Sequence, residues 1–372
     1  LHQRYNGTVA MIMAIFWLLL YIVVNLMSIL YLGALAISGI SGFSVVLCII
    51  LLAVFSIIIA LGGMKVIGYT DVIQVFFLIL GGLVASYIAL NLVSEKSGTT
   101  GVFNGLKLLA ANADDHFHMI FHKENKNYMD LPGLSVLIGG LWITNLNYWG
   151  CNQYITQRAL GADLKTARLA GKVNSIATIF TLDIYKKVIK PDASETNLVN
   201  LGKIAVVIAM VLGVILSLLV GDNLMGEGKQ GFQYIQEYTG FVSPGILAMF
   251  LLGFFWRKAT SNAALFATIG GFIFSVFFKF LPNFADLSFL ASSGFSKANS
   301  VGIYEIPFLD RMGFVFILCV IGMYIISMIE NSKGERPNAL EVDTKMFRVT
   351  PAFTAGSLII CGLLVAIYSI WW

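Results

Sequence analysis

Long, uninterrupted apolar runs dominate this sequence and limit what it can fold into. Nine of them reach the length of about 20 residues that a helix needs to cross a bilayer. Only 12% of the residues are charged, about half the share in soluble domains, and the runs lack the alternating pattern of β-barrel strands. We therefore predict an all-α polytopic membrane protein, with spans at 8–37, 43–62, 70–93, 132–154, 198–220, 231–255, 262–283, 307–329 and 350–372.

The basic residues predict an orientation. Lys and Arg concentrate in short cytoplasmic loops, and here they precede the first span and follow the second, fourth, sixth and eighth, as at Arg4, Lys65, Arg257 and Lys333. All of them fall on one side of the membrane, which we predict to be cytoplasmic together with the N-terminus of this chain. The chain starts without an initiator Met, and we expect that residues precede it.

The residue types that carry metal or covalent chemistry are sparse. The four cysteines lie in or beside apolar runs without metal-ligand spacing, and we interpret them as small buried hydrophobic residues. His116, His118 and His122 share a loop without a thiol or carboxylate frame, so we predict no metal site and no prosthetic cofactor. Because no nucleophile–base pair or nucleotide loop is found, we predict that the protein is not an enzyme. Lys279, Asp310 and Arg311 are expected to snorkel at outer span ends.

The stretch Gly140–Arg158 is the most polar part of any predicted span. Asn145, Tyr148 and Asn152 are spaced by three and four residues and so share one helix face, with Trp149 beside them. Amides both donate and accept hydrogen bonds, which suits sugar hydroxyls, and an aromatic ring can cover the apolar face of a pyranose. Helix-to-helix hydrogen bonds and interfacial aromatic residues would explain the same residues, and the pattern alone leaves both interpretations open.

A second polar stretch, Gly231–Gly245, lies in the sixth span. Its side chains Gln233, Gln236, Glu237 and Tyr238 precede Pro244 and Gly245, which are poor residues for a helix interior. A polar face that leads to a helix break is typical of a substrate pathway in transporters, although a simple proline kink in the headgroup region remains an alternative.

Two shorter features bear on the organisation. Asp71 and Gln74 share a helix face at the start of the third span, where Asp71 is either a cation waystation or a carboxylate favoured by the helix dipole. The run 173–185 is apolar at helical spacing but too short to cross a bilayer. It is either the inner end of an incomplete span or an amphipathic helix on the membrane surface. Gly-Gly pairs, such as Gly139-Gly140 and Gly270-Gly271, favour close helix packing over helix breaks.

Several long motifs together resemble the sodium/sugar branch of the solute:sodium symporter family, most closely bacterial sodium/galactose symporters. They are YTDVIQVFFLILGG, LPGLSVLIGGLWITNLNYWGCNQYITQRAL, ATIFTLDIYKKVI and FQYIQEYTGFVSPGILAMFLLGFFW. The resemblance covers nearly the whole chain. It implies the leucine-transporter-like fold of two inverted five-helix repeats with peripheral helices, and sodium-driven sugar transport by alternating access in a bacterial inner membrane.

The resemblance also implies roles for single residues. Asn145 and Gln236 match sugar-binding amides, Tyr148 matches the aromatic residue that stacks on the sugar and closes the inner gate, and Trp149 stands beside it as in the family. Asp71 matches an aspartate implicated near the cytoplasmic sodium path. Asn147 stands where close relatives tend to have an aromatic residue, so the shape of the pocket is expected to differ.

This chain departs from the family pattern in two places. Residues 1–172 match core helices three to six, 173–196 match a stub of the eighth core helix and a loop, and 197–372 match the ninth and tenth core helices with peripheral helices. The first two core helices and a segment near Lys172–Val173 are expected to be missing, and with them most sodium ligands.

The sequence therefore predicts sodium-coupled symport of a monosaccharide such as galactose or glucose, with sodium as coupling ion, the lipid bilayer as surroundings and no nucleic-acid partner. A sodium symporter for another organic solute, such as an amino acid or sialic acid, and a non-transporting truncated membrane protein remain alternatives. For the chain as given we expect no coupled uptake.

Overall fold

The structure is a computed structural model that describes residues 1–113, 116–118, 120–125, 128–129, 133–152, 172–225, 231–299, 301–335, 337–342 and 349–371. Its first half contains α1 (Gly7–Leu19), η1 (Leu20–Leu26), α2 (Met27–Ser41), α3 (Val45–Leu61), α4 (Gly63–Lys96), α5 (Val102–Asn112), α6 (Ser135–Ile138), α7 (Leu141–Leu146), η3 (Asn147–Cys151), α9 (Lys172–Thr178) and η4 (Ile179–Ile189). Its second half contains α10 (Glu195–Met225), α11 (Gly231–Gly240), α12 (Ser243–Phe255), α13 (Ser261–Leu265), η5 (Phe266–Gly270), α14 (Gly271–Phe280), η6 (Leu281–Asn283), η7 (Ser288–Leu290), β1 (Lys297–Ala298), β2 (Tyr304–Glu305), α15 (Phe308–Ser332) and α16 (Pro351–Ile370).

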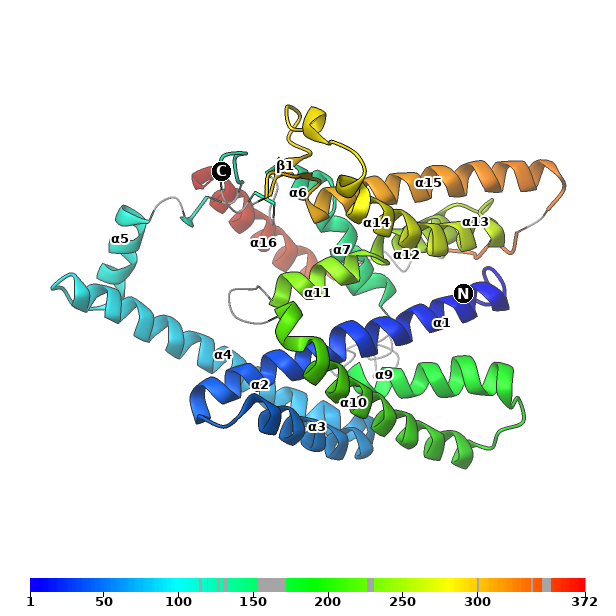
Figure 1. The fold of residues 1–372 in the computed structure, drawn as a ribbon, viewed down its shortest axis with the longest axis horizontal. Coiled ribbons are helices and arrows are strands. Elements are labelled where there is room, and N and C mark those ends of the chain that lie inside the picture. The colour runs from blue at the N-terminus through cyan, green and yellow to red at the C-terminus, as the bar shows by residue number, and fades with distance from the viewer. Residues whose placement is uncertain are drawn as a thin grey trace.

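The helices form two groups, which α1, α7 and α11 connect (Figure 1). In one group α10 packs against α2, α3 and α9, and in the other α12, α13 and α14 pack against α15. The main core runs between the groups, from Trp17 and Met210 to Met249 and Cys319. The all-α membrane fold predicted from the apolar runs is confirmed, with one short antiparallel pairing of β1 and β2 in the described part.

Among the described residues, six helical segments are long and apolar enough to cross a membrane, and the bent pair α11–α12 makes a seventh if it is counted as one span. Two of the nine predicted spans differ. The stretch 43–62 gives α3, whose 17 residues measure about 26 Å at 1.5 Å per residue. This helix is shorter than the hydrocarbon core of a bilayer, which is about 30 Å thick. The stretch 132–154 is broken in its described part into α6, α7 and η3, because the backbone turns sharply at Gly139, with φ −82° and ψ −94°.

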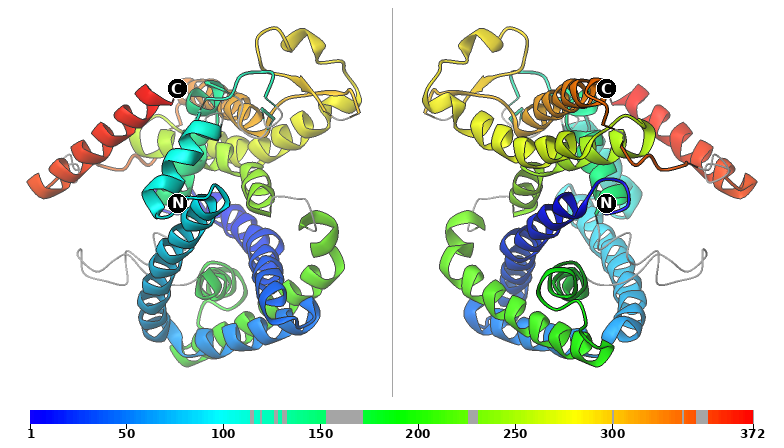
Figure 2. Two further views of the ribbon diagram at one scale, coloured as in Figure 1. Left: turned by 90° about the vertical axis from the view of Figure 1, so that its left-hand side faces the viewer. Right: turned by 90° about the vertical axis from the view of Figure 1, so that its right-hand side faces the viewer.

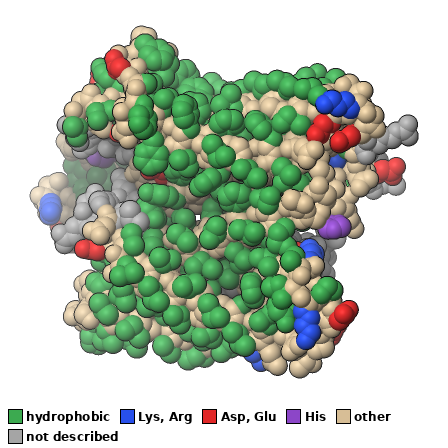
Figure 3. Space-filling view, turned by 45° about the vertical axis from the view of Figure 1, so that its right-hand side comes forward, with side chains coloured by type: hydrophobic (Ala, Val, Ile, Leu, Met, Phe, Trp, Pro, Cys, Tyr) green, Lys and Arg blue, Asp and Glu red, His purple; other side chains and the backbone are tan. Residues whose placement is uncertain are grey.

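Much of the apolar surface is exposed, as a protein in a bilayer requires. In Figure 3 hydrophobic side chains cover most of the visible face, while Lys, Arg, Asp and Glu gather near its edges. The span at Val72–Lys96 and the last span, α16, have no buried share in their most apolar windows, and α16 projects from the rest of the molecule (Figure 2). Their long apolar faces are therefore available to lipid.

The short run 173–185 is helical and packed inside the helix group. It lies in α9 and η4, which contact α1, η1 and α10. Ile176 and Ile179 belong to the main core, at 3% and 0% exposure. This packing favours the end of a span over an amphipathic helix on the membrane surface, since a surface helix would leave one face to lipid headgroups.

The prediction of close packing at glycine pairs holds for Gly270-Gly271 and only in part for Gly139-Gly140, where close packing and a helix break occur together. A Cβ on Gly140 would lie 2.2 Å from the Leu309 carbonyl oxygen, and one on Gly271 would lie 2.8 Å from the Gly245 Cα. Gly81 and Gly82 are the exception, with nothing within 4 Å. The cysteine prediction holds in part: Cys48 and Cys319 are buried, Cys151 is half-buried and Cys361 is exposed, and all four are free thiols.

Candidate functional site

The predicted sugar-binding residues of the fourth span lie on α7 and η3. Asn145 is exposed, and its amide donates to the Leu141 carbonyl one turn earlier at 2.9 Å. Tyr148 and Trp149 are 38% and 67% exposed, and their rings meet edge to face at 5.4 Å. These three side chains are thus open to a ligand, while the π-helical turn that carries the rings is a feature often found at functional sites.

Asn147 faces the opposite way, into the protein. It is 1% exposed, and its amide nitrogen donates to the Ser243 hydroxyl at 3.0 Å. Ser243 in turn donates to the Thr239 carbonyl at 2.9 Å. The Asn147 side-chain oxygen and the Thr239 hydroxyl are buried and have no hydrogen bond within the described part of the chain. Asn147 therefore fixes η3 against the break between α11 and α12.

Asn152 anchors the end of η3 to the first span. Its side-chain oxygen accepts a hydrogen bond from the Tyr21 hydroxyl, and Asn152 is 3% exposed. The Tyr21 ring stacks on Trp17, with centroids 5.2 Å apart. Asn152 was expected on the face of Asn145 and Tyr148, but η3 ends at Cys151 and the backbone becomes extended at Asn152. The shared helix face therefore stops one residue too early to include it.

The second polar stretch forms a broken span. Its segments Gln233–Gly240 and Ser243–Phe255 meet at an angle of 53°. Pro244 lies in the first turn of α12, where a missing N–H costs no helical hydrogen bond. Gln236 is half-buried on α11, about two turns before Ser243. The bond from Asn147 to Ser243 thus joins the segment of Asn145 and Tyr148 to the segment of Gln236.

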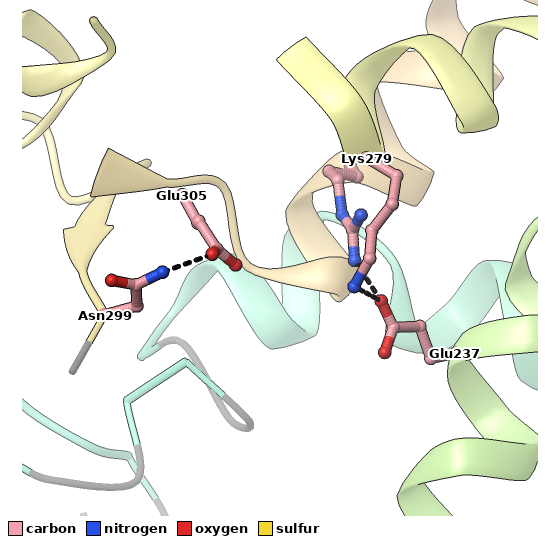
Figure 4. Close-up of polar contacts among 5 residues, drawn as sticks. Glu237, Lys279, Asn299 and Glu305 are labelled. Atoms are coloured by element: carbon pink, nitrogen blue, oxygen red, sulfur yellow. Dashed lines mark hydrogen bonds and ion pairs between the residues drawn. The ribbon is translucent and has the colours of Figure 1, made fainter. Parts of the chain in front are cut away.

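Glu237 forms an ion-pair cluster that sequence reasoning did not predict. One oxygen of Glu237 lies 2.6 Å from Lys279 Nζ and 2.6 Å from Arg311 Nη2, as Figure 4 shows for Glu237 and Lys279. Snorkelling of Lys279 and Arg311 at outer span ends stays a prediction, while both cations have a half-buried carboxylate on α11 as a partner. Asp310 is also buried rather than at an interface, at 2% exposure.

The predicted sodium-path residue, Asp71, lies in α4, but its side chain is outside the described residues. Its predicted neighbour Gln74 is exposed. The role of Asp71 therefore stays a prediction. The residues that sequence reasoning missed, Tyr21 and Ser243, sit in apolar or small-residue surroundings, and only their contacts with Asn152 and Asn147 mark them.

Comparison with known proteins places the chain in a family. Residues 1–169 and 166–271 match the model of the Sodium:solute symporter family. The chain is 33% identical to a sodium/glucose cotransporter of Vibrio parahaemolyticus over all of its own length and 78% of the relative's. The chain belongs to the sodium:solute symporter family. As a member it is a multi-pass membrane transporter and not an enzyme.

More distant relatives share the family but less of the sequence. The chain is 22% identical to the human sodium/myo-inositol cotransporter 2 over 73% of its length and 23% identical to a zebrafish (Danio rerio) sodium/glucose cotransporter 4 over 73%. It spans about half the length of these relatives, 53% and 54%. The family match is split into two segments that meet at 166–169, a few residues before the predicted missing segment, which stays a prediction.

Proposed function

We propose that this symporter family member carries a monosaccharide together with sodium, by alternating access. The observation that carries the proposal is the pairing of two segments: an exposed amide and two exposed rings on α7 and η3, joined through Asn147 and Ser243 to the broken span α11–α12. Broken spans and polar cavities near the bilayer midplane are where transporters bind substrate.

The chemistry of the exposed groups suits a polyhydroxylated ring. Asn145 and Gln236 each offer a donor and an acceptor, which is what a pair of vicinal hydroxyls needs. Tyr148 presents an apolar ring face that can cover the C–H face of a pyranose, and Trp149 supports it at 5.4 Å. Among the described residues, the hydrogen bond found for the Asn145 side chain is to the local Leu141 carbonyl, so its remaining hydrogen-bonding capacity is available to a ligand.

The relatives and the site together support one substrate class. The relatives are named for glucose and for myo-inositol, which are both six-membered rings rich in hydroxyls. We propose a ligand of this class, with galactose or glucose as the first candidates. An amino acid or sialic acid remains the alternative, since Asn147 replaces an aromatic residue expected there.

The experiment is uptake into proteoliposomes that contain the intact protein, with the helices expected to be missing from this chain in place. An inward sodium gradient should drive accumulation of radiolabelled galactose or glucose, and replacement of sodium by potassium should abolish it. Asn145→Ala should abolish uptake, while Asn104→Ala, which removes an exposed amide outside the proposed site with a similar local hydrogen bond, should leave it unchanged. Sugar uptake that ignores sodium would refute the coupling.

The proposal includes an expectation for the chain as it stands. Because the segment near Lys172–Val173 is expected to be missing along with sodium ligands, this chain should bind sugar weakly and fail to couple uptake to sodium. A protein of this sequence that accumulates sugar against its gradient would show that the segment is dispensable. If neither binding nor uptake of any solute is found, the non-transporting alternative replaces the proposal.

A further inference from the structure

A cavity of about 590 Å³ lies between the α6–α7 break, the start of α15 and the segment around Ser293. Its size is typical of small-molecule pockets, which span roughly 300–1,000 Å³. The wall is mainly apolar and aromatic. Neither Asn145 nor Gln236 lines it, so the sugar-site residues do not explain it.

One carboxylate, Asp310, lines this cavity without a geometric hydrogen bond or ion pair among the described residues. It is 2% exposed, and neither of its oxygens accepts a hydrogen bond in the described part of the chain. Ser135 lies close enough to interact with it, but not with hydrogen-bonding geometry. The N-terminus of α15 offsets part of the cost of the charge, yet burial of an unpaired charge costs several kcal/mol.

The basic residues nearby are engaged elsewhere. Lys123 lines the cavity, but its ammonium donates to the carbonyls of Ala291, at 3.3 Å, and Ser292. Lys297 lies over the Tyr128 ring at 5.7 Å. Arg311, the neighbour of Asp310 in sequence, pairs with Glu237 at 2.6 Å. His122 is the remaining basic side chain of the lining, and the ion pairs found among the described residues do not include Asp310.

Aromatic rings form much of the wall of the cavity that Asp310 lines. Trp142 meets Phe316 edge to face at 5.0 Å, and Phe295 packs on Phe314 at 5.3 Å. The Tyr128 hydroxyl donates to the Gly294 carbonyl at 2.7 Å, which fixes its ring at the rim. Such rings attract an ammonium through the negative potential of their faces.

The carboxylate is held in place by close backbone packing. A Cβ on Gly139 would lie 3.3 Å from an Asp310 oxygen, and a Cβ on Gly313 would lie 3.1 Å from the Gly139 Cα. The α6–α7 break therefore presses directly on the first turns of α15. This arrangement leaves Asp310 little freedom to turn out of the cavity toward water.

We propose that this cavity binds a small organic ammonium ion, with the ammonium on Asp310 and the apolar part against the rings of Trp142 and Phe314. A bare metal cation fits less well, because sodium prefers several oxygen ligands and the carboxylate stands in a mainly apolar wall. A sugar fits less well because the lining offers few hydroxyl partners. The inference does not rest on the proposed transport function.

The test is calorimetric titration of the purified full chain with 2-phenylethylammonium chloride, with the neutral 2-phenylethanol as a matched probe. We expect saturable binding of the amine, at least tenfold weaker binding to Asp310→Asn, and no difference for Asp286→Asn, which removes an exposed carboxylate outside the cavity. Phe314→Leu should lower the affinity for the amine about threefold. This variant keeps the test usable if Asp310→Asn does not fold.

Several outcomes would overturn the inference. They are the absence of saturable amine binding to the unmodified chain, equal affinity of Asp310→Asn, or equal affinity for 2-phenylethanol. Saturable binding of sodium chloride alone that is lost in Asp310→Asn would replace the organic ligand by a metal cation.

Discussion

At the scale of single residues, two asparagines on the same short segment have opposite environments. Asn145 is exposed and donates a hydrogen bond to Leu141 of its own helix, while Asn147 is 1% exposed and bonded across to Ser243. Residues two apart on a helix point in nearly opposite directions. One asparagine is therefore available to a ligand, and the other stabilises the position of the segment.

Asn145→Ala and Asn147→Ala should separate binding from stability. Asn147→Ala removes a buried hydrogen bond and should lower the free energy of unfolding by about 1 kcal/mol, seen as a lower melting temperature in detergent. Asn145→Ala should leave the melting temperature nearly unchanged while weakening sugar binding. Equal melting shifts for both variants would contradict the assignment.

The two cations that pair with Glu237 should contribute differently to the stability of the protein. Arg311 is 11% exposed and Lys279 is 36% exposed in their side chains. Both cation substitutions leave the same Glu237 carboxylate, so the difference comes from screening. Solvent screens the pair with the more exposed Lys279 more strongly than the pair with the less exposed Arg311. Arg311→Met should therefore lower the melting temperature more than Lys279→Met, and Glu237→Gln more than either. The reverse order of the two cation variants would refute this.

At the scale of elements, the broken span α11–α12 depends on tight backbone packing at its second half. Ser243, Pro244 and Gly245 are all buried, and the Gly245 Cα meets Gly271 of α14 closely. Proline at the first turn fixes where α12 restarts, because it needs no helical hydrogen bond there. The bend of 53° is thus determined by local sequence and by its neighbour α14 together.

Glycine-to-alanine substitutions test this packing. A Cβ at position 245 would lie 2.1 Å from the Ala267 carbonyl oxygen, so Gly245→Ala should destabilise the protein by about 1–3 kcal/mol. Gly82→Ala is the control, because nothing lies within 4 Å of its Cβ and alanine favours a helix interior by about 1 kcal/mol. The melting temperature should fall for the first and stay or rise for the second.

At the scale of the whole molecule, hydrogen bonds hold together three chain segments that are predicted to lie on the cytoplasmic side. Arg4 donates to the carbonyls of Gly253 at 2.6 Å and Trp256 at 3.1 Å. Asn331 donates to the Lys258 carbonyl at 2.8 Å. The N-terminus, the end of α12 and the end of α15 therefore lie together, as the charge pattern predicts, while the side of the membrane they occupy stays a prediction.

Labelling of introduced cysteines tests which side of the membrane the N-terminus of this chain occupies. Val301 and Lys333 flank α15 and are both exposed. In a Cys361→Ser background, Val301→Cys should react with an impermeant maleimide in intact cells, and Lys333→Cys only after permeabilisation. The opposite pattern would place the N-terminus outside.

The sequence alone determined the fold class and the positions of most spans, because apolar length is read directly from the chain. Helix starts at Asn6, Ser44, Thr260 and Thr350 are also local, since each side chain caps its own helix. The sequence further marked Asn145, Tyr148, Trp149 and Gln236 through their polarity and family resemblance, and their roles stay predictions. Only the tertiary structure decided which polar face turns inward: Asn147 to Ser243, Glu237 to two cations and Asp310 to a cavity. The physical reason is that periodicity assigns residues to a face, whereas the neighbour that meets this face comes from distant parts of the chain.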